Sequence, residues 1–208
     1  MYSIAAIESG FTPVGFSAHR DFEDRIYKSK PKVCDRFIVK YYKTYMDCTY
    51  NLNFGDKVIG FYAPLYAGSP HDIYKWLECI CKGFRTSYYL LDEEGPEIMI
   101  RCNEDWHDEL YVRLTILGPE EKYFDEQNEK FVYNDKIEEI YDKTKKTQII
   151  ADYMIKKEQL ITEFYRETNS YFKSLTKEDY GEPGAVRRPA IPNVRKYLKE
   201  LQNENKKY

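Results

Sequence analysis

The sequence predicts a single α+β domain: an antiparallel sheet of about five or more strands carries one packed helix, and a long helical segment and a tethered C-terminal helix follow. Two observations lead to this fold class. Residues 69–117 combine a helix-start signal with three strand-like runs, and from about residue 134 the apolar residues take up helical spacing. The length of 208 residues suits one domain, and 21 tyrosines and 11 phenylalanines supply apolar surface for a core.

The first third of the chain alternates short apolar or aromatic runs with turn residues. The run over 36–45 is rich in β-branched and aromatic residues, which favours a strand. Asn53-Phe54-Gly55-Asp56 has the composition of a turn, so the strand after it is expected to form a hairpin. The expected elements, in order, are a strand over 2–7, an edge strand over 11–16, a short surface helix over 19–28, and strands over 36–45 and 57–62.

The most consistent local signals lie between Ser69 and Leu117. Ser69 and Pro70 open a helix as N-cap and first helical residue, and apolar residues then recur on one helical face. Gly83 is expected to end this helix in left-handed backbone. Strands are expected over 88–91, 97–102 and 109–117. In the last of these, Leu110 and every second residue after it define an apolar face.

The second half of the chain changes its period. Residues 134–175 contain no glycine or proline and show two apolar stripes, which predicts one long bent helix or two helices in succession. Residues 1–177 would form the domain, and residues 178–192, with several prolines, would form an extended linker. Residues 193–208 would form a basic amphipathic helix capped by Asn193.

Composition narrows the class of protein. No apolar run reaches the roughly 18 residues that span a bilayer, and the N-terminus has no basic segment before an apolar one, which predicts a cytoplasmic protein without membrane contact. Five cysteines are an odd number, so free thiols are expected rather than a disulfide framework. Their spacing does not match a zinc site, and no cofactor motif is present.

The charge of the chain is unevenly distributed. The net charge is −3, yet residues 92–129 hold 13 Asp and Glu against 3 Lys and Arg. Aromatic residues are interleaved with these acids, a composition that suits contact with a basic partner, because charge speeds encounter and desolvated rings supply affinity. The predicted partner-binding residues are Glu93, Glu94, Glu104, Asp105, Trp106, Asp108 and Tyr111.

Two other classes of function stay open at this stage. A small metal-dependent hydrolase or nuclease would use His107 with Asp108 and Glu109, because a histidine beside carboxylates can act as a general base or a metal ligand. A nucleic-acid-binding protein would use the C-terminal tail, where Arg187, Arg188 and five further basic residues outnumber Glu200 and Glu204. The missing catalytic motifs argue against an enzyme.

The leading hypothesis is therefore a cytoplasmic protein-binding inhibitor, of the toxin-immunity or phage anti-defence type. It would use the acidic surface of residues 92–109 to block a basic partner such as a nuclease. This hypothesis depends on the charge distribution and on the missing catalytic motifs.

Overall fold

The structure is a computed structural model. It describes residues 4–8, 26, 28–43, 47–64, 69–92, 97–104, 108–119, 123–125, 130–132, 147–175, 188–204 and 206. The expected edge strand at 11–16, most of the helix at 19–28, the first part of the long helix at 134–146 and most of the linker at 178–187 lie outside these residues.

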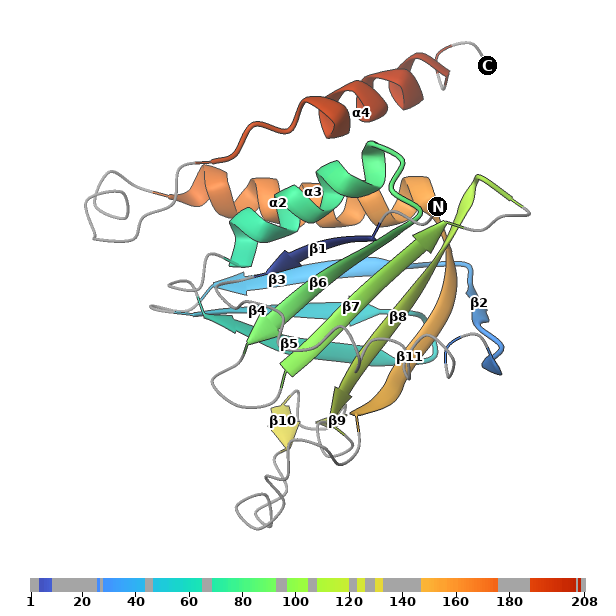
Figure 1. Ribbon diagram of the computed structural model, residues 1–208. Coiled ribbons are helices and arrows are strands. Elements are labelled where there is room, and N and C mark those ends of the chain that lie inside the picture. Colours follow the sequence, from blue (N-terminus) through green and yellow to red (C-terminus); the bar gives the residue numbers. More distant parts are fainter. Residues whose placement is uncertain are drawn as a thin grey trace.

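The protein is a mixed α+β fold with two larger sheets and three helices among the described residues (Figure 1). The six-stranded sheet has the order β1-β6-β7-β8-β11-β2, the second sheet has the order β3-β4-β5, and β9 pairs with β10. The strands are β1 (Ile4–Glu8), β2 (Lys32–Cys34), β3 (Ile38–Lys43), β4 (Asp47–Asn53), β5 (Val58–Pro64), β6 (Thr86–Asp92), β7 (Glu97–Glu104), β8 (Tyr111–Pro119), β9 (Tyr123–Asp125), β10 (Lys130–Val132) and β11 (Thr147–Lys156). The helices are α2 (Ser69–Cys81), α3 (Lys157–Ser174) and α4 (Pro192–Glu204).

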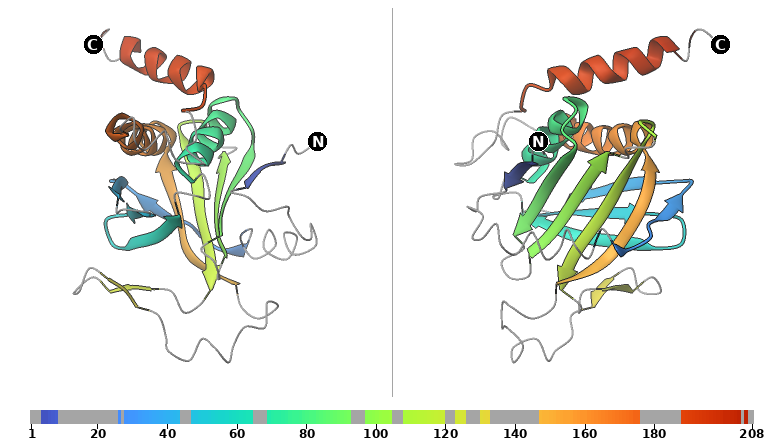
Figure 2. Two further views of the ribbon diagram at one scale, coloured as in Figure 1. Left: turned by 90° about the vertical axis from the view of Figure 1, so that its left-hand side faces the viewer. Right: turned by 45° about the vertical axis from the view of Figure 1, so that its right-hand side comes forward.

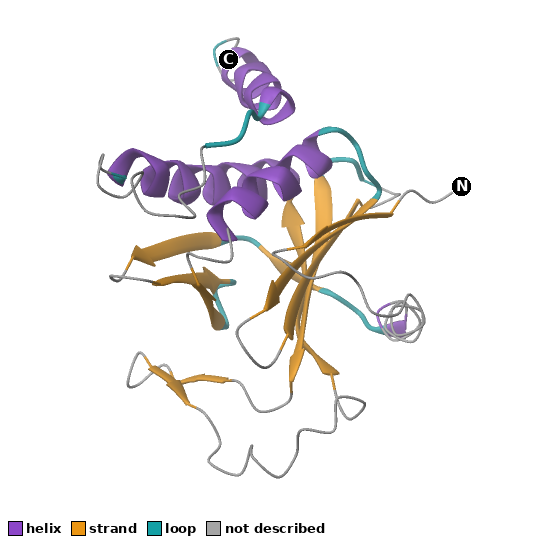
Figure 3. Ribbon diagram, turned by 60° about the vertical axis from the view of Figure 1, so that its left-hand side comes forward, coloured by secondary structure: helices purple, strands orange, loops and turns teal. Residues whose placement is uncertain are grey.

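The helices lie in two layers at one end of the two sheets (Figures 2 and 3). Helices α2 and α3 lie side by side across one end of the sheets, and α4 lies on their outer side (Figures 2 and 3). One continuous core joins buried residues from both sheets and from all three helices. The fold class predicted from the sequence is therefore confirmed.

Helix α2 matches its sequence signals closely. It begins at Ser69, and Ile73, Trp76, Leu77 and Ile80 are all buried. Gly83 has a φ of 84°, the left-handed conformation that favours glycine at a helix end. The N–H of Gly83 donates to the carbonyl of Ile80 at 3.1 Å, which closes the last turn.

The alternation in β8 is confirmed over most of its length. Val112, Leu114 and Ile116 are buried against the core, whereas Arg113 and Thr115 point to the other face. The predicted start of this strand is wrong. Leu110 lies in the turn before β8 and is 72% exposed, because the backbone turns there and the strand alternation does not yet apply.

The prediction of a helix through 147–156 is wrong, since these residues form β11. Ile150 and Met154 are four residues apart, which fits a helical stripe and a strand face equally well. The residues that enter the core are instead Ala151, Tyr153 and Ile155, with a spacing of two. Pairing along β8 decided between the two periods, and α3 starts only at Lys157.

The sheet also differs from the purely antiparallel one expected. β1 pairs with β6 in parallel, and β11 pairs with β2 in parallel, so the six-stranded sheet is mixed. The hairpin predicted around Asn53–Asp56 exists, but its first strand is β4, which the sequence analysis did not identify. β2, β9 and β10 were also missed, since three residues are too few to show a period.

Helix α3 connects the two sheets. The Phe164 ring lies 5.9 Å from the ring of Phe37, next to β3, and 5.3 Å from the ring of Trp76 in α2. On its polar side, Glu163 and Glu167 accept the backbone N–H groups of Val39 and Tyr41, each at 3.1 Å. These carboxylates satisfy the outer edge of β3 as a further strand would.

Substitution of Phe164 by alanine is expected to destabilise the whole domain by about 3–5 kcal/mol, because it leaves a cavity where α3, α2 and the segment before β3 meet. Urea denaturation followed by circular dichroism measures the free energy of unfolding. The exposed α3 residue Lys173 supplies a matched control, since Lys173→Ala should change it by less than about 0.5 kcal/mol. A loss below about 1 kcal/mol in Phe164→Ala would contradict this account of the core.

Candidate functional site

Three of the seven predicted partner-binding residues lie in the described part of the chain. Glu104 ends β7, Asp108 lies in the turn after it, and Tyr111 begins β8. The other four lie outside the described residues: Glu93, Glu94, Asp105 and Trp106. The same holds for His107.

The acidic stretch is divided between two ends of the six-stranded sheet. Asp92 and Glu97 pair at one end of β6 and β7, and Glu104 lies at the other end of β7. β7 has eight residues, so about 24 Å separate its ends. Among the described acids, Asp92 and Glu97 therefore lie far from Glu104.

In the β7–β8 connection, the structure describes Glu104 and residues 108–111. Glu104 forms an ion pair with Lys157 at the start of α3, and this pair removes one negative charge from the surface. Asp108 Oδ1 accepts the N–H of Leu110 at 2.9 Å, and the carbonyl of Leu110 accepts the N–H of Lys157 at 2.8 Å. The turn thus fixes the first turn of α3 and leaves Glu109 and Leu110 exposed.

Asp108 and Glu109 are the described residues of the proposed catalytic group. The Asp108 carboxylate is engaged by the backbone of its own turn, and the Glu109 side chain is exposed. Within the ranges that the structure describes, no group of three or more His, Cys, Asp or Glu residues could hold a metal ion.

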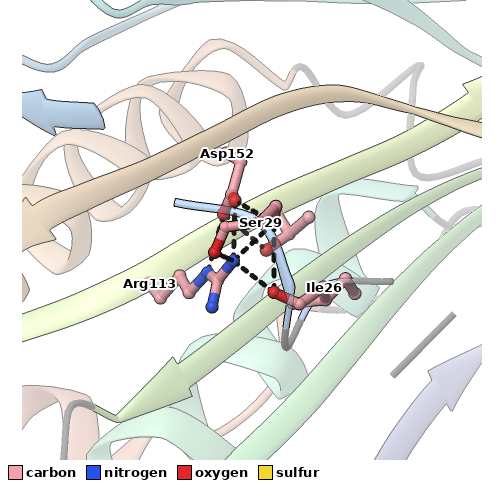
Figure 4. Close-up of polar contacts among 5 residues, drawn as sticks. Ile26, Ser29, Arg113 and Asp152 are labelled. Carbon is pink, nitrogen blue, oxygen red and sulfur yellow. Dashed lines mark hydrogen bonds and ion pairs between the residues drawn. The ribbon is translucent and has the colours of Figure 1, made fainter. Parts of the chain in front are cut away.

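A polar cluster that sequence reasoning missed lies on the face of the six-stranded sheet opposite the core (Figure 4). Arg113 on β8 and Asp152 on β11 form two hydrogen bonds of 2.8 and 2.7 Å, with side chains 16% and 9% exposed. Thr115 donates to Asp152 at 3.2 Å, and Ser29 donates to it at 2.7 Å. The alternation of β8 placed Arg113 and Thr115 on this face, but Asp152 could be added only once β11 was known to be a strand.

Opposing effects act on the pKa of Asp152 in this cluster. Burial by itself would raise the pKa of Asp152, but hydrogen bonds from Arg113, Ser29 and Thr115 and the Arg113 charge outweigh it and hold the pKa of this carboxyl below its usual range. Asp152 is therefore ionised and fully engaged. The cluster connects β8, β11 and the segment at Ser29. It supplies no group suited to proton transfer.

The C-terminal helix is attached to α2 by a glutamate. Both carboxylate oxygens of Glu78 are used: they accept the backbone N–H groups of Asn193 and Val194 at 3.2 and 3.0 Å and the side-chain amide of Asn193 at 2.7 Å. The prediction that Asn193 caps this helix is therefore corrected, because Glu78 supplies the acceptor. Val194 is fully buried below this contact.

The basic residues of the C-terminal tail include both engaged and exposed side chains. Arg188 donates to Asn169 Oδ1 at 2.7 Å and lies over the Tyr74 ring at 5.5 Å, so its charge is used inside the protein. Arg195, Lys196 and Lys199 are exposed on the outer side of α4. Arg187 and Lys207 lie outside the described residues. The short row of exposed cations is interrupted by Glu200, which lies 4.0 Å from Lys196.

Four of the five cysteines are described as free thiols: Cys34, Cys79, Cys81 and Cys102. Burial raises the pKa of Cys81 and of Cys102 to about 12. Burial also raises the pKa of Cys34 and of Cys79. Since the thiolate is the reactive form, the geometry does not mark any of these thiols as a nucleophile.

Comparison of the chain with protein-family models, curated proteins and solved structures found no match. None of the helices in the described ranges is long and apolar enough to cross a bilayer.

Replacement of Asp152 by asparagine tests the polar cluster through its pH dependence. A carboxyl with a lowered pKa in the folded state stabilises the protein above its unfolded pKa, about 3.9, and this contribution is lost as the pH falls through the folded value. Wild type should therefore be more stable than Asp152→Asn at neutral pH, and the difference should shrink below about pH 4. Denaturation from pH 7 to pH 3 measures it, with exposed Glu200→Gln as control. A difference independent of pH would contradict the assignment.

Replacement of Glu78 by alanine should loosen α4 specifically. Loss of a helix-cap acceptor costs about 0.5–2 kcal/mol, so the amides of residues 193–204 should exchange faster with solvent while those of α3 keep their rates. Hydrogen exchange with mass spectrometry resolves the two helices. Glu158→Ala, at an exposed position in α3, is the control. Unchanged exchange in α4 would show that Glu78 does not hold the helix.

Proposed function

We propose that the protein is a protein-binding module of the inhibitor type, which attaches to a basic partner through the turn between β7 and β8. The observation that carries the proposal is the exposure of Leu110, which is 72% exposed beside the acids Asp108 and Glu109. A large apolar side chain held in water next to negative charges is suited to a partner that offers an apolar pocket with a basic border.

Hydrogen bonds at residues 108–111 support this proposal. The N–H of Leu110 is held by Asp108 Oδ1, and the N–H of Tyr111 donates to the carbonyl of Asp108 at 3.1 Å. The carbonyl of Leu110 is fixed by the N–H of Lys157. A side chain on such a preorganised turn loses little conformational entropy when it binds, so more of the contact energy appears as affinity.

The charges of the turn set the kind of partner. Glu104 is neutralised by Lys157, so Asp108 and Glu109 carry the negative charge that approaches a partner. Lys156 is exposed and pairs with Tyr111 across the sheet, which confines the acidic surface to the turn. Electrostatic attraction to a basic surface then raises the association rate and weakens as salt increases.

The proposal differs from the sequence hypothesis in its choice of residues. Charge reversal at Glu104 would place two cations together at Lys157 and damage the fold, so it is a poor test of binding. Glu93 and Glu94 lie outside the described residues and stay a prediction. The test therefore concentrates on Asp108, Glu109 and Leu110.

The informative variant is D108N/E109K/L110S. Asparagine retains the oxygen that accepts the Leu110 N–H, so the turn keeps its capping bond while charge and apolar contact are removed. The control is E200K/E204K, which changes two exposed acids on α4. Tagged chains are used to capture the partner from native host lysate at low and high salt, and the purified partner is then titrated against each chain.

We expect the triple variant to lose at least about tenfold in affinity, because truncation of a central contact typically costs more than about 1 kcal/mol. The control should bind within about twofold of wild type, and wild-type binding should weaken with salt. Equal affinity of wild type and triple variant would reject this surface, and a wild-type chain that captures no protein would reject the class of function.

A further inference from the structure

The segment before β3 crosses the edge of the six-stranded sheet (Figure 1). Ile26 and Ser29 contact Arg113 and Asp152 on the face opposite the core (Figure 4). A few residues later, Cys34 is 2% exposed and belongs to the core on the other face. We call the described residues of this crossing, 26 and 28–34, the strap.

Arg113 holds the strap on the first face. Its Nη2 donates to the carbonyl of Ile26 at 2.6 Å, to the carbonyl of Ser29 at 3.2 Å and to Ser29 Oγ at 2.7 Å. Asp152 holds the same guanidinium from β11 and also accepts the Ser29 hydroxyl. One charged side chain thus fixes two backbone carbonyls of a segment more than 80 residues away in sequence.

The other attachments of the strap are weaker. β2 has only three residues, and its middle residue Val33 is 66% exposed. The Lys32–Asp56 ion pair is 2.6 Å long, but its side chains are 68% and 49% exposed, and exposed pairs contribute little. Cys34 adds a thiol contact of 3.4 Å to the carbonyl of Phe54. Backbone pairing of β2 with β11 adds a ladder over only these three residues. Among the side-chain contacts of the strap, those of Arg113 are the strongest, because its charge is largely shielded from solvent.

We propose that the strap is a conformational switch: residues 26 and 28–34 open together when they are released from the Arg113–Asp152 pair, and opening converts Cys34 from an inert thiol to an accessible one. Local opening of a short edge element below the energy of global unfolding is common in proteins. Among the described residues of the strap, Ile26 and Cys34 are the buried apolar side chains, and residues 28–33 are exposed or half-buried. Most of the apolar core is formed by other elements, so the domain remains folded when the strap opens.

The labelling rate of the Cys34 thiol measures how often the strap opens. In the closed state its thiol is buried, and burial raises its pKa, so it reacts slowly. Cys102 is fully enclosed in β7 and reports global opening. Iodoacetamide labelling of the native full chain, followed by peptide mass spectrometry, gives a separate rate for each thiol.

The test compares two variants with a matched control. R113K keeps a positive charge beside Asp152 but loses the planar fork in which Nε and Nη2 hold the carboxylate while Nη2 also reaches the strap, and S29A removes only the hydroxyl. K75M breaks the Lys75–Asp72 ion pair on α2, away from the strap. We expect R113K to speed Cys34 labelling about 10- to 100-fold and S29A to speed it several-fold, because bonds to a charged donor are lost. Cys102 should keep its wild-type rate in both variants, and K75M should change neither rate.

Two outcomes would overturn the proposal. If Cys34 and Cys102 accelerate together, the thiol is exposed by global unfolding and the strap is not an independent unit. If Cys34 labelling in both R113K and S29A stays at the wild-type rate, the Arg113–Asp152 pair does not control opening. The S29A variant removes a single partly buried hydroxyl, so it gives a result even where R113K fails to fold.

Discussion

The position of α3 between two sheets is the constraint on which the rest of the structure depends. The helix continues directly from β11, so it is tied covalently to the six-stranded sheet. Its buried residues Leu160, Ile161 and Phe164 then pack into the common core, and Glu163 and Glu167 bond to the backbone of β3. Because one helix satisfies an apolar face and a strand edge at the same time, the two sheets are stabilised as one domain.

Charged side chains in this protein repeatedly satisfy backbone groups of distant segments. Glu78 accepts two N–H groups at the start of α4, and Arg113 donates to the carbonyls of Ile26 and Ser29. Buried backbone groups must be paired, and a charged partner makes the stronger bond. These charged side chains hold irregular connections, so composition alone overstates how much charge is available to a partner.

The connection between β7 and β8 contains both engaged and exposed acidic side chains. Glu104 is engaged by Lys157, and Asp108 by the N–H of Leu110, while Glu109 and Leu110 are exposed to solvent. The sequence placed function in this stretch because of its acids. The proposed contact lies in the same stretch but depends on Leu110, since an exposed apolar residue beside acids is more specific than net charge.

The sequence by itself determined the elements whose signals are local. Helix α2 has a start signal, an apolar face and a terminal glycine within fifteen residues, and β8 alternates over most of its length. Tertiary structure decided the rest, because it depended on pairing between distant segments. β11 shows both helical and strand spacing until β8 pairs with it, and Ser29, Arg113 and Asp152 meet only after that pairing. Local periodicity does not predict such contacts, because their energy comes from residues far apart in the chain.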